Sequence, residues 1–148
     1  MLGGEEDGDS VLRSALLLCR ALWAEDEGDG DRGQYGELQH RRGNLESWLG
    51  DELRMVAKER TLEFSKLGVS HLPAVLAWLA ARGTQEACEI LCKAGDFQLA
   101  LLVSQSSTPV VRQLVLKQLQ QWKESGADAL ISDDRLRIYV LLSGEQVR

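Results

Sequence analysis

Two cysteines one helical turn apart have the closest spacing to metal ligands in this sequence. Three residues separate Cys88 from Cys92, so a helix would bring both thiols to the same side. A structural zinc site needs four ligands, usually cysteines and histidines. The other candidates, His40, His71 and Cys19, lie far apart and form no second pair. We therefore predict no metal ligand and no cofactor, and we expect the three cysteines to be free thiols buried in a helical core.

The histidines are the side chains best suited to act as general bases. A catalytic histidine needs a nucleophile or a carboxylate beside it, and the sequence places neither next to His71, so a surface or helix-capping role is the simpler interpretation. His40 precedes Arg41 and Arg42, a small basic cluster that could contact an acidic partner but fits a solvated helix face better. The glycines fall at expected helix ends and make no phosphate-binding pattern. The sequence therefore predicts no catalytic residue, no cofactor-binding residue and no enzymatic activity.

Tryptophans and one proline motif are the remaining candidates for recognition. Tryptophan is enriched at interface hot spots, but at helical spacing within apolar stripes core packing is the better interpretation. Trp122, near the end of a long helix, is the one that we consider most able to reach a partner. Thr108 with Pro109 could be a proline-directed phosphorylation site, although a helix cap explains the pair without it. The four tryptophans are Trp23, Trp48, Trp78 and Trp122. The sequence does not assign any residue to contact with a partner.

The composition is that of one helical domain. The chain has 148 residues, of which 44% are hydrophobic and only two are prolines, and good helix formers dominate. The net charge of −6 argues against direct nucleic-acid binding, which normally uses a basic face. No apolar stretch reaches the roughly 20 residues that span a bilayer, so no transmembrane segment is predicted. Free cysteines favour a reducing compartment, cytosolic or nuclear.

Acidic residues gather in two segments near the start of the chain. Residues 1–9 are rich in glycine and acid, and we expect them to be disordered. Residues 10–148 are predicted to be a helical solenoid fragment with an acidic loop at 25–33. That loop could bind a basic ligand, but a solvated linker is the better interpretation. Ser10 is expected to cap a first helix that stops near Ala24.

The middle of the sequence predicts two helices with a boundary between them. A short helix is expected over residues 35–42, and Asn44 then has the type of an N-cap residue. Apolar residues at helical spacing predict a second helix that extends to about Ser65. Gly50 weakens the middle of that helix by about 1 kcal/mol relative to alanine, so a kink or break there is a further possibility.

From residue 70 onward, caps, prolines and glycines mark helix ends at regular intervals. The expected helices are about three or four turns long, and their short links force neighbours to lie antiparallel. This pattern predicts an all-α fold of stacked helix hairpins, either an irregular α-solenoid or a compact helical block. The helices are expected to begin at Ser70 with Pro73, Thr84, Asp96, Thr108 with Pro109, and Asp133; glycines at 83, 95, 126 and 144 end four of them, and a short turn or helix spans 127–131.

Six blocks of the sequence carry a resemblance to a known family: Arg41–Arg42, Ser47–Leu49, Leu72–Leu79, Glu86–Cys88, Ala94–Gln105 and Arg135–Gly144. In this order they resemble the nuclear protein ninety-six family of scaffold nucleoporins. The similarity extends from about Leu16 to Val147. It rests on the colinear order of helix-and-cap blocks and not on one chemical fingerprint.

The resemblance implies a structural role in the nuclear pore complex at the nuclear envelope. The family is similar to the ancestral coatomer element, an irregular helical solenoid with trunk, crown and tail, and builds the Y-shaped outer-ring complex. Other helical scaffold nucleoporins are the implied partners, and mRNA export and protein transport would depend on the assembly indirectly. No strand-rich blade segment precedes the first helix, so we do not expect direct binding of the family's β-propeller partner. The chain would be a fragment, a short isoform or an incomplete gene model that covers trunk and crown helices.

A vesicle-coat or adaptor α-solenoid outside the nuclear pore is the alternative. Such proteins are built from the same kind of stacked helices, and fold alone does not separate the two functions.

Overall fold

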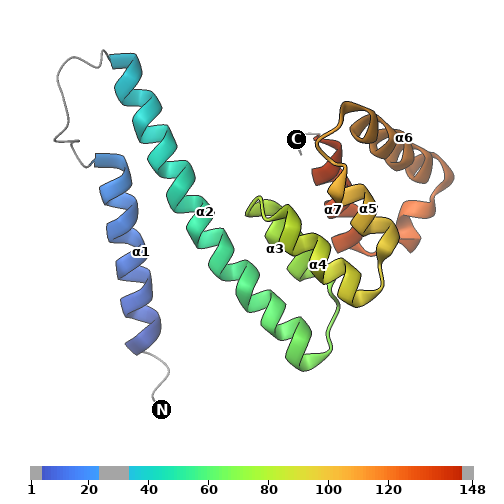
Figure 1. The fold of residues 1–148 in the computed structure, drawn as a ribbon, viewed down its shortest axis with the longest axis horizontal. Helices are drawn as coiled ribbons and strands as arrows, with labels where there is room; N and C mark the ends of the chain where they lie inside the picture. Colours follow the sequence, from blue (N-terminus) through green and yellow to red (C-terminus); the bar gives the residue numbers. More distant parts are fainter. Residues whose placement is uncertain (1–4, 24–33, 145–148) are drawn as a thin grey trace. The chain divides into compact units, whose positions relative to one another are not determined.

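All secondary structure in the described part of the chain is helical. The computed structural model describes residues 5–23 and 34–144, and within those ranges it contains no strand, which confirms the predicted all-α class (Figure 1). The helices of these ranges are α1 (Glu5–Trp23), α2 (Gln34–Leu67), α3 (Leu72–Ala80), α4 (Thr84–Ala94), α5 (Phe97–Ser104), α6 (Pro109–Ser125), the 3-10 helix η1 (Ala127–Leu130) and α7 (Asp133–Ser143).

The chain divides into two compact units, an N-terminal unit of residues 1–52 and a C-terminal unit of residues 53–148. The boundary falls inside α2, which contributes its first half to the N-terminal unit and its second half to the C-terminal unit. In the N-terminal unit, Nε1 of Trp48 on α2 donates a hydrogen bond of 3.2 Å to the backbone oxygen of Ser14 on α1. Among residues 8–23 of α1, the half-buried ones are Ser14, Leu18, Ala21 and Leu22.

The first helix begins earlier than its predicted cap. Helix α1 starts at Glu5 and not at Ser10, so residues 5–9, which were expected to be disordered, are helical. The segment is acidic, and negative charge is favoured near a helix N-terminus because the helix dipole is positive there. The acidic loop predicted at 25–33 lies outside the described residues.

Helix α2 is continuous where two helices were predicted. It runs from Gln34 to Leu67 through both Asn44 and Gly50, so the predicted boundary and the possible break are wrong. A glycine in a helix costs only about 1 kcal/mol relative to alanine, which neighbouring interactions can offset. Ion pairs one turn apart join Arg41 to Glu37 and Arg42 to Glu46 along this stretch. Neither α2 nor any other helix in the described ranges is long and apolar enough to cross a lipid bilayer.

The core of the C-terminal unit is built from one face of each of its α-helices. Helix α4 packs on both α3 and α5, and α7 packs on both α6 and α3, so the last helix of the unit lies against α3. The contacts of this unit therefore make a compact helical block. Each fully buried aliphatic side chain stabilises it by about 1.5–3 kcal/mol. The largest of these side chains are Val75, Leu91, Leu99, Val103, Val115 and Ile138.

The second half of α2 belongs to this core and is tied to α3 by a hydrogen-bonded hydroxyl. Ala57 is fully buried, and Thr61 lies one turn further along. The Thr61 hydroxyl donates to the backbone oxygen of Ala57 at 2.8 Å and accepts the indole N–H of Trp78 at 2.8 Å. The buried indole of Trp78 therefore has a polar partner, as buried indoles usually do.

Helix starts in the C-terminal unit agree with the sequence to within a residue. Thr84 and Asp133 are the first helical residues and not the caps, which are Gly83 and Ser132. Asp96 and Thr108 occupy the predicted N-cap positions. The Ser70 hydroxyl accepts the backbone N–H of Leu72 at 3.3 Å, and Pro73 lies in the first turn of α3 as expected.

Helix ends follow the predicted glycines, but Gly83 serves a different purpose from the others. Glycines 95, 126 and 144 adopt the left-handed conformation that terminates a helix. At the end of α3 it is Arg82 that has positive φ, whereas Gly83 donates its backbone N–H to the oxygen of Trp78 at 2.7 Å. A Cβ atom on Gly83 would lie 2.5 Å from Cε3 of Trp78. Glycine is required there because the indole ring occupies the space.

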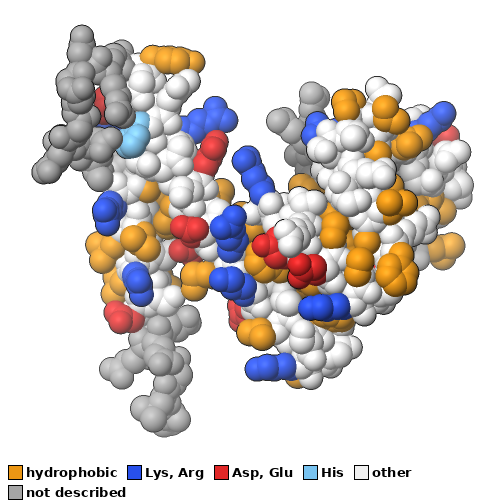
Figure 2. All heavy atoms as spheres, in the orientation of Figure 1, with side chains coloured by type: hydrophobic (Ala, Val, Ile, Leu, Met, Phe, Trp, Pro, Cys, Tyr) orange, Lys and Arg blue, Asp and Glu red, His pale blue; other side chains and the backbone are white. Residues whose placement is uncertain are grey.

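Hydrophobic side chains also remain on the surface of the C-terminal unit (Figure 2). Phe97 and Leu101 are exposed on α5, and Val110 and Leu114 are exposed on α6. These residues lie one turn apart in pairs, on the sides of their helices that the core does not cover.

We expect two glycine-to-alanine substitutions to change stability in opposite directions. Gly83→Ala should lower the free energy of unfolding by about 1–3 kcal/mol, because the new methyl group collides with the Trp78 ring. Gly43→Ala on α2 should raise it by about 0.5–1 kcal/mol, because a Cβ there meets nothing within 4 Å and alanine favours the helix. Urea unfolding of both variants measures the two changes, and equal destabilisation by both would contradict this packing.

Candidate protein-binding surface

The Asp96 carboxylate connects three helices of the C-terminal unit. Its Oδ2 atom lies 3.1 Å from Nε2 of His71, which precedes α3, and also accepts a hydrogen bond from the guanidinium of Arg135 in the first turn of α7. Asp96 itself is the N-cap residue of α5. The Asp96 side chain is 14% exposed and the His71 side chain 20% exposed, so the pair is largely shielded from water.

Neighbouring groups stabilise the ionised form of Asp96. Burial acts to raise the pKa of Asp96, but hydrogen bonds from Arg135 and His71, the charge of Arg135 and the backbone amide of Leu99 outweigh it, so the pKa is lowered. An ionised carboxylate only accepts hydrogen bonds, so Nε2 of His71 carries the proton in this contact. The ring of His71 also meets Phe64 edge-on, with ring centroids 6.2 Å apart. The geometry fixes the ends of three helices.

The three cysteine thiols are more exposed than the sequence predicted. Cys19 and Cys92 are exposed and Cys88 is only half-buried, so the expectation of three buried thiols is wrong. The buried face of α4 passes through Ala87 and Leu91, which leaves Cys92 on the solvent side. The Cys88 thiol donates a weak hydrogen bond of 3.7 Å to the backbone oxygen of residue 100.

Among the described residues, no nucleophilic side chain contacts the His71–Asp96 pair. A histidine with a carboxylate is half of the arrangement that hydrolases use, and sequence reasoning missed this pair because the two residues are 25 positions apart. Burial, and secondarily the neighbouring Cys92, raises the pKa of Cys88, so this thiol is a poor nucleophile at neutral pH. No three His, Cys, Asp or Glu side chains gather as a cation site in residues 5–23 and 34–144. His40 is half-buried on α2, beside two exposed arginines.

The four tryptophans divide between core and surface. Trp78 is buried, as expected. Trp122 packs on Tyr139 with ring centroids 4.8 Å apart, so it joins α6 to α7 and does not project outward. Trp48 is half-buried against α1. Trp23 is 67% exposed, so its predicted core position is wrong, because α1 packs through the side that carries Ser14 and Trp23 lies on the opposite side.

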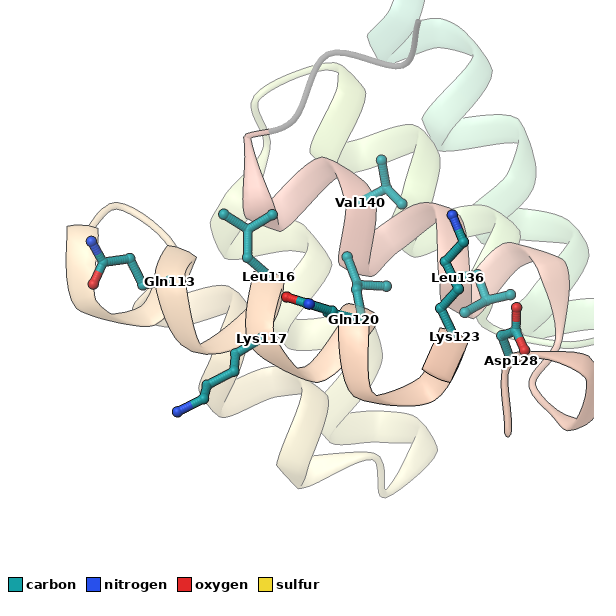
Figure 3. Close-up of a pocket in the computed structure, with 9 residues that line it drawn as sticks. Gln113, Leu116, Lys117, Gln120, Lys123, Asp128, Leu136 and Val140 are labelled. Carbon is teal, nitrogen blue, oxygen red and sulfur yellow. The ribbon is translucent and has the colours of Figure 1, made fainter. Parts of the chain in front are cut away.

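The outer face of α7 is where the C-terminal unit forms a surface able to receive another chain. A hollow of about 780 Å³ lies between α6 and α7, and a second of about 450 Å³ lies between α3 and α7. Leu136 and Val140 line both hollows, so these two side chains lie between them. Figure 3 shows Leu116 and Gln120 of α6 in the first hollow together with these two residues of α7. We name the combined apolar area the α7 surface, made of Leu76, Leu116, Leu119, Leu136, Val140 and Leu141.

The α7 surface is apolar at its centre and charged at its rim. Lys117, Lys123 and Asp128 line one hollow, and Asp133 and Arg137 line the other. An open apolar trough with a mixed polar rim suits an amphipathic helix laid along it, one of the recurring modes of peptide recognition. Contiguous exposed apolar area on a protein commonly marks such a contact.

The sequence predicted that Leu136 and Val140 lie in the last helix, but it did not assign them to a surface. The inner side of α7 is set by Ile138, Tyr139 and Leu142, which are buried. Residues 138–142 of α7 are all apolar and show no polar stripe that identifies an outer side. The signal that would have found Leu136 and Val140 is therefore the excess of apolar residues over what one inner face needs.

We expect Asp96→Asn to destabilise the C-terminal unit by about 1–3 kcal/mol at neutral pH, because it removes the charge that pairs with a partly buried Arg135. The lowered pKa of Asp96 stabilises the fold above the ordinary aspartate pKa of about 3.9, and that stability is lost as pH falls through the lower pKa of the folded protein. Chemical unfolding at a series of pH values measures both effects.

The difference between wild type and Asp96→Asn should therefore shrink in acid. Asp51→Asn on α2 is the matched control, since this carboxylate is exposed and should change stability by no more than about 0.5 kcal/mol. A difference between wild type and Asp96→Asn that stays constant down to low pH would show that the carboxylate charge is not what holds the three helices.

Known proteins share the sequence of this helical block. A sequence model of the family described as Nuclear protein 96 matches residues 73–148, the stretch from the first turn of α3 through α7. The chain is similar to the nuclear pore complex protein Nup98-Nup96 of Dictyostelium discoideum, 31% identical over 113 residues that cover 74% of this chain and 6% of the relative. It is similar to the Nup98-Nup96 protein of Drosophila melanogaster, 34% identical over 135 residues that cover 88% of this chain and 7% of the relative.

A plant relative agrees with these two. The nuclear pore complex protein NUP96 of Arabidopsis thaliana is 31% identical over 106 residues, which cover 70% of this chain and 10% of the relative. The chain thus spans a tenth or less of the length of the relatives that it matches. The family match begins with α3 and includes every helix that lines the α7 surface. By this match, this chain belongs to the Nuclear protein 96 family.

Proposed function

We propose that this chain is part of a structural constituent of the nuclear pore complex, in which the α7 surface binds a helix of another scaffold nucleoporin. The family match and the names of three relatives as nuclear pore complex proteins support this role. The role places the chain in the nucleus, at the nuclear envelope. Support for mRNA export and protein transport would follow indirectly, through assembly of the pore.

The role is structural and not catalytic in this proposal. The partly buried polar cluster of the C-terminal unit is explained by helix anchoring, since His71 and Arg135 both bind Asp96. The block of α3 to α7 would be one segment of an irregular solenoid in a longer protein. Solenoids bury the faces of successive helices against each other and use the remaining faces for partners.

The observation that carries the proposal is that residues of α7 line two hollows, one on each side of the helix. Leu136 and Val140 stand between two hollows, so a helix laid on α7 could bury apolar area from α3, α6 and α7 together. Leu141 is 45% exposed at one edge of this area and is the most accessible apolar side chain of α7. A partner helix with a leucine-rich stripe and mixed flanking charges would match the centre and the rim.

A capture experiment with the full chain tests the role. We expect the tagged chain to recover nuclear pore proteins from nuclear extract, and we expect Leu141→Glu to reduce that recovery at least about tenfold. Burying an unpaired carboxylate costs more than the ~1.4 kcal/mol that corresponds to tenfold in binding. Leu101→Glu is the matched control, because Leu101 on α5 is 60% exposed and lines neither hollow.

Two results would count against the proposal. A folded wild-type chain that recovers no nuclear pore protein contradicts the role, and equal loss in Leu101→Glu and Leu141→Glu contradicts the α7 surface. Circular dichroism of each variant checks that the helices persist. Imaging of the tagged full-length gene product should show a nuclear rim, whereas cytoplasmic puncta would indicate the coat or adaptor alternative.

A further inference from the structure

Helix α1 carries an apolar stripe that its own unit does not cover. Leu12 is 64% exposed, Leu16 is 69% exposed and Trp23 is 67% exposed. Cys19 lies between them and is also exposed. We name these four residues the α1 stripe. Leaving such large apolar side chains in water on one helix is unfavourable, so the stripe is a candidate contact for another chain.

The hairpin of the N-terminal unit packs through the other side of α1. Nε1 of Trp48 binds the backbone oxygen of Ser14, and Leu18 is half-buried one turn further on. A helix turns about 100° per residue, so Leu16 lies about 200° around α1 from Ser14. The first half of α2 therefore meets the side of α1 opposite to the stripe, and the packing of this unit explains Ser14 and Leu18 but not Leu12 or Leu16.

The spacing of the α1 stripe is that of a helix-packing seam. Its members follow one another at intervals of four, three and four residues. Such a 4-3-4 pattern keeps apolar side chains in line along a helix and lets a second helix pack on it with knobs in holes. The stripe is about 16 Å long, three turns of helix. A partner with the same spacing on a helix of similar length would cover it.

Charge beside the stripe selects the partner. Arg13 and Arg20 are exposed and lie seven residues apart, so they occupy the same position relative to the seam. From Leu12 to Trp23 they are the only charged residues, in a chain whose net charge is −6. A shallow hollow of about 560 Å³ on this side is lined by both arginines, by two stripe leucines, by Leu17 and by Asp9. Figure 2 shows hydrophobic and basic side chains next to one another over α1.

We propose that the α1 stripe docks an amphipathic helix of a partner protein whose apolar seam is flanked by glutamate or aspartate on the side that faces Arg13 and Arg20. Opposite charges at the flanks of a helical seam set partner choice and orientation, while the apolar residues supply most of the affinity. This inference concerns the N-terminal unit and does not depend on the role proposed for the α7 surface.

A second copy of the chain fits the stripe less well than an acidic helix. In an antiparallel pair, residues at the position of Arg13 and Arg20 face their own equivalents, so arginine would meet arginine. In a parallel pair they would face the positions of Ala15 and Leu22, which offer no opposite charge. An acidic flank satisfies both arginines and a second copy satisfies neither.

Two synthetic peptides test the charge preference with the full chain. Both carry leucine at the seam positions of three heptads, one with glutamate at every flanking position and the other with lysine. We expect fluorescence anisotropy to show that the glutamate peptide binds at least about tenfold tighter at low salt, with the difference decreasing as salt is added. The double variant Arg13→Glu with Arg20→Glu should reverse the preference.

Substitutions in the seam test the apolar contact. Leu16→Asp should abolish binding of the glutamate peptide, whereas Leu38→Asp, at a residue of α2 that is 61% exposed, should leave it unchanged. Circular dichroism shows whether each variant keeps its helices. The variant Leu141→Glu should bind the peptide like wild type, so failure of the α7 surface and failure of the α1 stripe can be told apart.

Three outcomes would overturn the proposal. The first is equal binding of both peptides, or a preference that survives the double charge reversal. The second is a concentration-dependent dimer in analytical ultracentrifugation that Leu16→Asp abolishes, which assigns the stripe to a second copy. The third is a folded, monomeric chain that binds neither peptide, which means that another part of the same chain covers the stripe.

Discussion

The contact of Asp96 with both His71 and Arg135 constrains how the helices of the C-terminal unit are arranged. It joins the start of α3 to the start of α7 at the N-cap of α5, so three helix termini meet at one carboxylate. A partly buried ion pair of this kind gives little net stability compared with apolar packing, but removing one partner leaves a charge without compensation. Arrangements that separate α7 from α3 are therefore penalised, and the last helix is held on the first.

Return of α7 onto α3 explains why the C-terminal unit has a surface suited to partners. The helix buries Ile138 and Tyr139 on its inner side and contacts α6 and α3 on its flanks, which leaves Leu136 and Val140 between two hollows. The N-terminal unit presents apolar residues differently. Its α1 packs through a side that includes Ser14 and exposes a straight seam. The trough on one unit and the seam on the other are the shapes that helices offer to other helices, which is the behaviour expected of a scaffold.

Local sequence signals predicted most of the helical pattern of the C-terminal unit. The glycine at 95 and the proline at 109 are strong signals because each has a physical reason that does not depend on distant residues. The signal at Asn44 and Gly50 was misleading, because a cap residue or a glycine inside a long helix can be tolerated where ion pairs and packing outweigh a loss of about 1 kcal/mol. Trp23 shows a similar limit of local signals: its apolar side chain predicts burial, but the sequence does not say which chain would bury it.

The functional surfaces could be predicted less well than the helices. The meeting of His71 with Asp96 depends on how three helices are arranged, and no local pattern encodes it. The outer side of α7 becomes apparent only once its inner side is known. The family resemblance was carried by blocks in order, among them the Ala94–Gln105 block, and the match over residues 73–148 confirms it. The order of these sequence blocks is thus enough to identify the family, whereas the surfaces depend on how the helices pack.

Native-state hydrogen exchange is the most direct test of whether α7 is held on α3 as part of one cooperative block. Amides in the middle of α3 and α7 should exchange with the same opening free energy, close to that of global unfolding, because α7 cannot leave without exposing Ile138 and separating Arg135 from Asp96. Opening of α7 at a free energy several kcal/mol below that of α3 would contradict the account, since the last helix would then be an independent element and its outer face no fixed surface.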